Sequence, residues 1–176
     1  MEFGALHCTP KRPMCDFCPL QIGCEAFRAH TVGILPVKIK LVKPRNRYFN
    51  YLIILQNNKY GHQEIYLHKR TSKDIWKGMY ELPLIESPSA MEPEELFGSP
   101  GWKTIFGEQK LRIIEYSEAS KHQLTHQTIH ARFVSVYLEG TLGNNNDWQR
   151  IELNHLPDFP LPRLIDKYLK QKKIIL

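Results

Sequence analysis

Four cysteines lie within the first 24 residues of this 176-residue chain, and the remainder contains none. Cys8, Cys15, Cys18 and Cys24 follow the spacing C-x6-C-x2-C-x5-C, with prolines and a glycine between them that favour turns. A secreted, disulfide-bonded domain usually distributes its bridges over the whole fold. Four thiolates in one short loop are instead typical of a metal centre.

The residue types leave the metal open, because zinc and iron–sulfur clusters both accept four thiolates. Structural zinc usually takes two short cysteine pairs separated by a longer stretch, whereas here only Cys15 and Cys18 form a short pair. The spacing therefore favours an iron–sulfur cluster over zinc. Four free thiols in a reducing compartment are the alternative without any metal.

Basic residues are concentrated after the cysteine segment. Lysine and arginine exceed aspartate and glutamate by 24 to 18, which gives a net charge of +6 and permits an anionic partner. Residues 26–63 contain seven lysines and arginines and no acidic residue. We interpret residues 28–45 as a basic connector, in which Val37, Ile39 and Leu41 alternate with lysines as in an edge strand or an extended strap. A solvated linker kept extended by its own charge is the alternative.

The rest of the chain predicts an α+β fold, a mixed β-sheet with packed helices over about residues 46–176. Stretches rich in β-branched and aromatic residues predict strands with turns between them. A proline near the start of one segment, and an apolar stripe at helical spacing in another, predict helices. Strands are expected at 48–55, 64–69, 79–85, 111–116 and 129–138, turns at 57–58 and 143–147, and helices at 91–97 and 161–170.

A family becomes recognisable in the cysteine segment. Residues 3–20, continued by Cys24-Glu25-Ala26-Phe27, resemble the [4Fe-4S] loop of the helix-hairpin-helix DNA glycosylases. The match is closest to the MutY-type adenine DNA glycosylases, on the basis of Gly4-Ala5, Thr9-Pro10 and Cys18-Pro19-Leu20. The resemblance implies that residues 1–27 are the end of a glycosylase domain and that all four cysteines bind a [4Fe-4S] cluster.

In that family the cluster braces a loop whose basic residues contact DNA, and it does no redox chemistry on the base. The resemblance implies that Lys11 and Arg12, between the first two cysteines, contact DNA phosphates. Such contacts set the position on DNA and the salt dependence of binding, and they carry no sequence preference. His122 is a further expected contact with the DNA backbone.

A second resemblance, to the Nudix pyrophosphohydrolases, lies in Trp76-Lys77-Gly78-Met79-Tyr80-Glu81-Leu82-Pro83 and the acidic segment Glu92-Pro93-Glu94-Glu95. A working Nudix motif presents several carboxylates on one helical face to hold Mg2+ and substrate phosphates. This chain lacks the Gly-Gly loop and the Arg-Glu-x-x-Glu-Glu pattern of that motif. MutY proteins carry a Nudix-like shell without the metal site, so the resemblance implies a Nudix-like lesion-recognition domain over residues 46–176.

Gln123-Leu124-Thr125-His126 resembles the Phe-Ser-His loop with which MutY proteins recognise 8-oxoguanine opposite adenine. The resemblance implies that Leu124 is an apolar wedge, Thr125 the hydrogen-bonding hydroxyl and His126 a supporting or backbone-contacting residue. In 8-oxoguanine N7 carries a proton and becomes a donor, and a hydroxyl can accept from it. Without the family, the same residues would indicate an ordinary loop before a strand.

Three histidines, His122, His126 and His130, recur at intervals of four. On a helix they would lie on one face and suggest a metal site. Because the strand expected at 129–138 follows them directly, we expect them to extend from a loop into a strand, where they do not converge.

The resulting hypothesis is the C-terminal part of a MutY-type adenine DNA glycosylase, which removes adenine paired with 8-oxoguanine in base excision repair. The catalytic residues of that family precede the cluster loop. We therefore expect none in this chain, and no adenine release by these residues alone. The expected partners are double-stranded DNA containing 8-oxoguanine:A and the protein's own N-terminal glycosylase domain.

No apolar run approaches the roughly 20 residues that span a bilayer, so we expect a cytoplasmic protein without a membrane partner. Taken with the resemblance, we expect it to be a monomer associated with the bacterial nucleoid. Two other function classes stay open. One is a diverged Nudix pyrophosphohydrolase that acts on an oxidised nucleotide with Mg2+. The other is a zinc-bound, non-catalytic module whose basic connector docks on a protein partner.

Overall fold

A computed structural model describes residues 2–9, 11–35, 44–140, 142 and 147–174 of the chain. The chain divides into two units, Met1–Lys43 (unit 1) and Pro44–Leu176 (unit 2). No helix within these described ranges is long and apolar enough to cross a membrane.

Unit 1 consists of short helical segments joined by turns. Backbone hydrogen bonds from Thr31 N to Ala26 O (2.9 Å) and from Leu35 N to Thr31 O (3.1 Å) continue this unit into the predicted connector. The strap predicted around residues 37–41 lies outside the described residues. The segments are α1 (Glu2–Leu6), the 3-10 helix η1 (Cys15–Phe17) and α2 (Glu25–Arg28).

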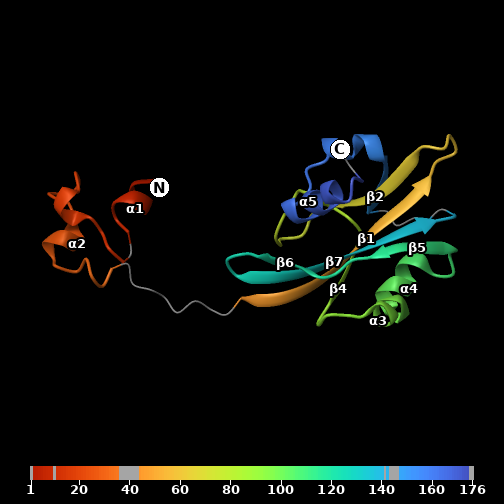
Figure 1. The fold of residues 1–176 in the computed structure, drawn as a ribbon, viewed down its shortest axis with the longest axis horizontal. Coiled ribbons are helices and arrows are strands. Elements are labelled where there is room, and N and C mark those ends of the chain that lie inside the picture. The colour runs from red at the N-terminus through yellow and green to blue at the C-terminus, as the bar shows by residue number, and fades with distance from the viewer. Residues whose placement is uncertain (1, 10, 36–43, 141, 143–146, 175–176) are drawn as a thin grey trace. The chain divides into compact units, whose positions relative to one another are not determined.

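Unit 2 is built on two long strands that are far apart in sequence and lie side by side (Figure 1). Strand β1 (Arg45–Asn57) pairs in parallel with β7 (Gln127–Leu138), in a register that runs from Arg45 opposite Gln127 to Leu55 opposite Tyr137. Both faces of this pair are covered. Residues 49–56 of β1 are therefore all buried, without the alternation of a half-exposed strand.

The other strands extend the sheet on both sides of this pair. The order is β3-β2-β1-β7-β5, with β4 also pairing with β1, β6 with β7 and β8 with β2. Every pairing except that of β1 with β7 is antiparallel. The bounds are β2 (Gln63–Lys69), β3 (Tyr80–Glu81), β4 (Leu84–Ser87), β5 (Leu111–Tyr116), β6 (Ser120–Gln123) and β8 (Trp148–Glu152).

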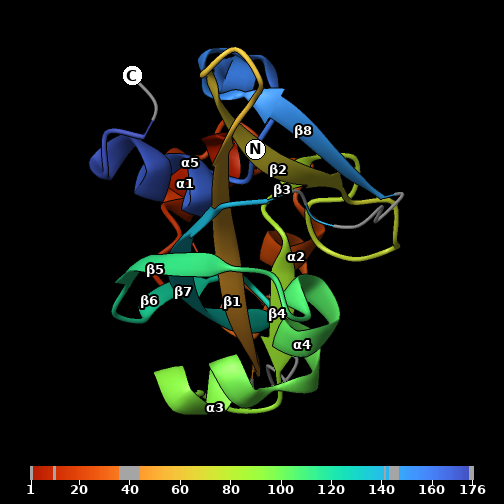
Figure 2. The same cartoon turned by 90° about the vertical axis from the view of Figure 1, so that its right-hand side faces the viewer.

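Helices cover the two faces of the sheet (Figures 1 and 2). Helix α5 (Arg163–Gln171) and the 3-10 helix η2 (Leu153–Asp158) pack on the face of Phe49, Tyr51 and Phe133. Helices α3 (Pro93–Gly98) and α4 (Pro100–Phe106) pack on the opposite face. The predicted α+β fold, a mixed β-sheet with packed helices, is confirmed.

The predicted elements differ from the structure in a few places. The strand expected at 79–85 is split into β3 and β4 at Leu82 and Pro83, because proline cannot donate to a ladder. Helix α4 and strands β6 and β8 were not predicted; α4 starts where the Ser99 hydroxyl accepts from Trp102 N at 3.2 Å. Most of the predicted turn at 143–147 lies outside the described residues.

A buried arginine organises the loop between β2 and β3, residues 71–79, which we name the Trp76 loop. Arg70, only 6% exposed, donates to Glu81 Oε2 at 2.7 Å, to Asp74 Oδ2 at 2.9 Å and to the Ile75 carbonyl at 2.9 Å. Its backbone pairs with Met79 and Gly78 and closes the loop. The guanidinium thus has a partner on three sides, as a buried charge requires.

A second arginine joins the Trp76 loop to the two strands beside it. Arg47 on β1 makes a bidentate ion pair with Glu86 of β4, with both bonds at 2.7 Å, and donates to Asp74 Oδ2 at 2.8 Å. It also donates to Gln127 Oε1 at 3.4 Å. Burial would raise the pKa of the Asp74 carboxyl, but the bonds from Arg47 and Ile75 N hold the pKa below its ordinary value.

We expect acid to destabilise unit 2 through Asp74. A carboxyl whose folded-state pKa is lowered stabilises fully above its unfolded pKa of about 3.8, and this contribution is lost as the pH falls through the lower folded value. Urea unfolding between about pH 5 and pH 2 measures the loss. Asp74→Asn should be less stable than the parent at neutral pH and lose less stability on acidification, whereas Asp166→Asn on α5 should behave as the parent. Parallel curves for Asp74→Asn and the parent would contradict this.

Candidate functional site

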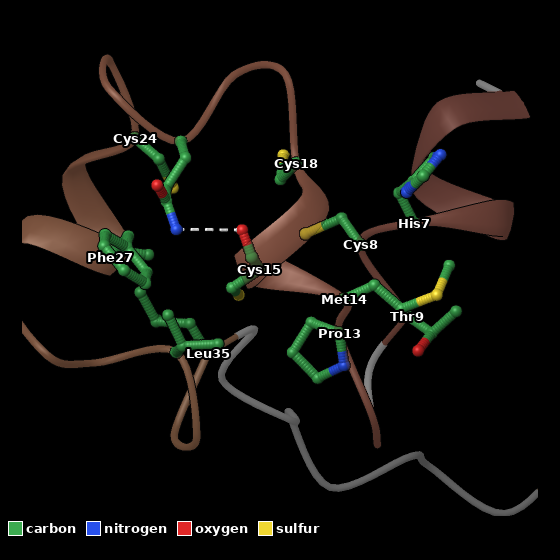
Figure 3. Close-up of a pocket in the computed structure, with 14 residues that line it drawn as sticks. His7, Cys8, Thr9, Pro13, Met14, Cys15, Cys18, Cys24, Phe27 and Leu35 are labelled. Atoms are coloured by element: carbon green, nitrogen blue, oxygen red, sulfur yellow. Dashed lines mark hydrogen bonds between the residues drawn. The ribbon is translucent and has the colours of Figure 1, made fainter.

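All four cysteines line one cavity of about 490 Å³ in unit 1 (Figure 3). Backbone hydrogen bonds three residues apart, each 3.0 Å, link Cys18 N to Cys15 O, Gln21 N to Cys18 O and Cys24 N to Gln21 O. The Gln21 side chain donates to Cys15 O at 3.0 Å, as the dashed line in Figure 3 marks. These consecutive turns bring Cys15, Cys18 and Cys24 to the wall of the cavity, and Cys8 joins them from the segment that follows α1.

The wall of this cavity is mostly apolar apart from the thiols. Burial, and then the charges of Cys18, Cys24 and Cys8, raise the pKa of the Cys15 thiol. His7 Nδ1 is buried without a hydrogen-bond partner among the described atoms. The apolar lining comes from Pro13, Met14, Ala26, Phe27, Val32 and Leu35.

The thiols that line the cavity are donors to more than one kind of metal centre. Zinc holds thiolates about 2.3 Å from the ion. Within the part of the chain that the structure describes, no three His, Cys, Asp or Glu side chains converge closely enough to hold a single ion. Four thiols on the wall of one cavity supply the donors that both zinc and iron–sulfur centres take.

The two basic residues expected to contact DNA lie on the loop that leads from Cys8 to Cys15. Lys11 and Arg12 are both exposed, and the Thr9 hydroxyl donates to the Arg12 carbonyl at 2.7 Å. This bond folds the loop back on itself and leaves both cationic side chains in solvent. The geometry is compatible with contacts to phosphate.

The residues expected to recognise 8-oxoguanine lie at the turn between β6 and β7. Thr125 and His126 are the two central residues of this turn, which the bond from Leu124 N to Gln127 O closes at 2.8 Å. Both side chains are exposed. Leu124 is half-buried and packs against the core on the α5 side of the sheet. In this conformation Leu124 anchors the turn, and Thr125 and His126 project from it into solvent.

The three histidines lie on different elements, as their spacing before a strand predicted. His122 on β6 is half-buried, with its ring centroid 5.9 Å from that of Trp76. His126 is at the exposed turn. His130 on β7 stacks on Tyr48 at 4.9 Å, and its Nε2 lies 3.2 Å from Asn46 Oδ1.

In the acidic segment that resembles the Nudix helix, the carboxylates of Glu92 and Glu95 bind neighbouring protein groups. Glu92 precedes α3, and its backbone N–H donates to Glu95 Oε2 at 3.0 Å. The Glu92 carboxylate accepts from Arg132 Nη2 at 3.3 Å. These groups start a helix and form an ion pair, and no cluster of metal-binding side chains includes them in the described ranges.

The sequence did not indicate the contacts that hold the exposed turn in place. Arg47 lies in the basic stretch of residues 26–63 and Trp76 in the Nudix-like motif, and neither signal points to this turn. In the structure Arg47 bonds to Gln127, directly after the turn, and Trp76 lies against His122, before it. A tryptophan and an arginine carry no local signal for such long-range contacts.

Comparison with known proteins adds the following findings. The model of the NUDIX domain family matches residues 50–171. Adenine DNA glycosylases of Buchnera aphidicola subsp. Schizaphis graminum and subsp. Baizongia pistaciae are 26% and 24% identical over 97% and 98% of this chain, which is 46% of each relative. The chain thus spans about half the length of the curated relatives that it matches.

Among solved structures, the C-terminal domain of mouse MUTYH, crystallised with human PCNA, is 12% identical and has a TM-score of 0.57, covering 73% of this chain and 88% of that chain. At this identity the likeness shows the fold alone. The sequence match to the glycosylases extends over almost the whole chain, cysteines included. The chain therefore belongs to the NUDIX domain family, and it corresponds to the C-terminal half of adenine DNA glycosylases.

Proposed function

We propose that this chain is the DNA-binding and lesion-recognising part of an adenine DNA glycosylase that removes adenine paired with 8-oxoguanine. Its partner is then double-stranded DNA with 8-oxoguanine:A, together with the glycosylase domain of the same protein. One observation carries the proposal: adenine DNA glycosylases align with 97% of the chain, so that the cysteine loop and the NUDIX domain match together. No residue of this chain is assigned to cleavage of the glycosidic bond.

In this proposal the four cysteines hold a [4Fe-4S] cluster. Their support is the cavity that all four thiols line together, since an iron–sulfur cluster takes four thiolates from one short segment. The bound cluster would brace the loop of unit 1. Lys11 and Arg12 on that loop then contact phosphates from a fixed position.

In unit 2, Thr125 is the proposed reader of 8-oxoguanine. Its exposed hydroxyl accepts from the N7–H of the lesion, while its own proton is donated elsewhere. Normal guanine has no proton on N7, so it cannot make this bond. His126, the other exposed residue of the turn, supports the hydroxyl or contacts the DNA backbone. Leu124 acts as a wedge only if it leaves its contact with the core.

Replacing the reading hydroxyl tests the role of unit 2. We expect Thr125→Ala to lower the preference for an 8-oxoguanine:A duplex over T:A by roughly three- to tenfold, the worth of one hydrogen bond. The slope of binding against salt should not change, because a neutral hydroxyl releases no counterions. Titrations of both duplexes over a salt series measure this, with Thr104→Ala on α4 as the control. Equal losses on both duplexes would remove Thr125 from the reading role.

The metal content of the chain tests the role of the cysteines. After anaerobic reconstitution with iron and sulfide, we expect the chain to bind both in equal amounts. Cys15→Ser should bind much less, because it removes one of four thiolates. Iron, sulfide and zinc analysis gives the answer, with Thr9→Ala as a variant that lines the same cavity without a thiol. Stoichiometric zinc without sulfide would refute the cluster.

The salt dependence of binding tests the contacts of unit 1. We expect Lys11→Gln with Arg12→Gln to lower the slope of log affinity against log salt by about two and to weaken both duplexes alike. The preference for the lesion should stay as in the parent. Lys103→Gln on α4 is the matched charge control. An unchanged slope in the double variant would place the phosphate contacts elsewhere.

A further inference from the structure

The Trp76 loop is linked to both strands of the hairpin that carries Thr125 and His126. On β6, two residues before Leu124, the ring of His122 lies 5.9 Å from that of Trp76. On β7, Gln127 directly follows the turn and accepts from Arg47, which in turn binds Asp74 of the loop. The loop is thus linked to both strands that flank the turn, directly to β6 through Trp76 and to β7 through Arg47.

The Trp76 loop can hold the hairpin in place because hydrogen bonds fix the loop to the sheet. Arg70 holds Asp74 and the Ile75 carbonyl from inside the loop and is itself held by Glu81 of β3. Two backbone bonds, from Arg70 N to Met79 O at 2.9 Å and from Gly78 N to Arg70 O at 2.8 Å, close the loop at its base. A polar network this fully bonded is rigid.

The backbone of Trp76 is a second, independent sign that the loop is constrained. Its φ is +59°, in the left-handed region that bulky residues rarely adopt. The conformation persists where surrounding contacts determine it, and here the indole packs against the core on the α5 side of the sheet and against His122. Such backbone outliers cluster at functional sites.

The turn is anchored at its base by Leu124, which packs on the core, and its tip is held by backbone bonds. The bonds from Leu124 N to Gln127 O and from Arg45 N to His126 O fix its backbone, and the side chains of its two central residues are in solvent. A hydroxyl that distinguishes a hydrogen-bond donor from an acceptor on the edge of a base must be held within about 0.5 Å of its productive position. A two-residue turn reaches that precision only when its flanking strands are held from outside.

We propose that the Trp76 loop is a brace for the hairpin, and that Trp76 is a positioning residue for lesion recognition, acting through His122. This rests on the proposed function of Thr125. It gives His122 a supporting role within the protein in place of a contact with phosphate. It also assigns a use to the NUDIX-like segment around Trp76, whose neighbouring carboxylates serve the arginines of the sheet.

Two variants of Trp76 separate the brace from general stability. Trp76→Asn removes the ring, and asparagine tolerates the left-handed backbone. Trp76→Phe keeps a ring against His122. In the 176-residue chain, we expect Trp76→Asn to lower the preference for 8-oxoguanine:A over T:A by up to the three- to tenfold expected for Thr125→Ala. The salt slope should stay as in the parent, and Trp76→Phe should retain most of the preference.

Hydrogen exchange gives a readout that does not depend on DNA. The Leu124 and Arg45 amides, which hold the turn, should exchange faster in Trp76→Asn, while amides in the middle of β1 exchange as in the parent. Faster exchange throughout unit 2, or equal weakening on both duplexes, would show a general loss of stability and overturn the brace. Loss of preference in Trp76→Phe equal to that in Trp76→Asn would do the same.

The two proposals fail in different ways. If Thr125→Ala loses lesion preference and Trp76→Asn does not, the brace is wrong and the reading role of Thr125 stands. If Thr125→Ala changes nothing, the proposed function is wrong, and hydrogen exchange at Leu124 decides the brace alone: unchanged exchange overturns it, and faster exchange supports it.

Discussion

The parallel pairing of β1 with β7 is the constraint on which the rest of unit 2 depends. Its two faces are buried under different helices, so a shift by one residue would turn core side chains such as Tyr51 and Phe133 to the wrong face. The same register places Arg45 opposite Gln127. The exposed turn at Thr125 and His126 therefore directly precedes the first paired residue of β7. Burial in the middle of the sheet fixes the register, and the register fixes where the candidate reading residues lie.

The charged side chains of the Trp76 loop and of the strands beside it form ion pairs with one another. Asp74, Glu81 and Glu86, which lie in and beside the NUDIX-like segment, are bonded to two arginines. Buried ion pairs contribute little net stability compared with apolar packing, but they fix geometry, because breaking one partner leaves a charge without compensation. The network thus favours a role in holding the loop and the hairpin in one arrangement.

Unit 1 is held together differently. Phe17, Leu20 and Ile22 are 83%, 62% and 102% exposed, so a segment of this length gains little from burial. Its regular features are the short helices and the consecutive turns from Cys15 to Cys24, and all four thiols line one cavity. For a segment with so small a core, binding of a metal centre contributes directly to folding. The proposed cluster would then be the main structural constraint on the loop that carries Lys11 and Arg12.

The sequence by itself determined the elements whose signals are local. The apolar run of β1, Pro93 at the start of α3 and the stripe of α5 each predicted a feature that the structure contains, and the motifs predicted the Nudix-like fold. It did not predict β6 or β8, short strands that exist only because β7 and β2 offer them a ladder. Tertiary structure alone decided that Leu124 turns to the core, that His122 lies against Trp76 and that Arg47 reaches Gln127. These contacts join residues far apart in the chain, and no local pattern of residue types carries information about such partners.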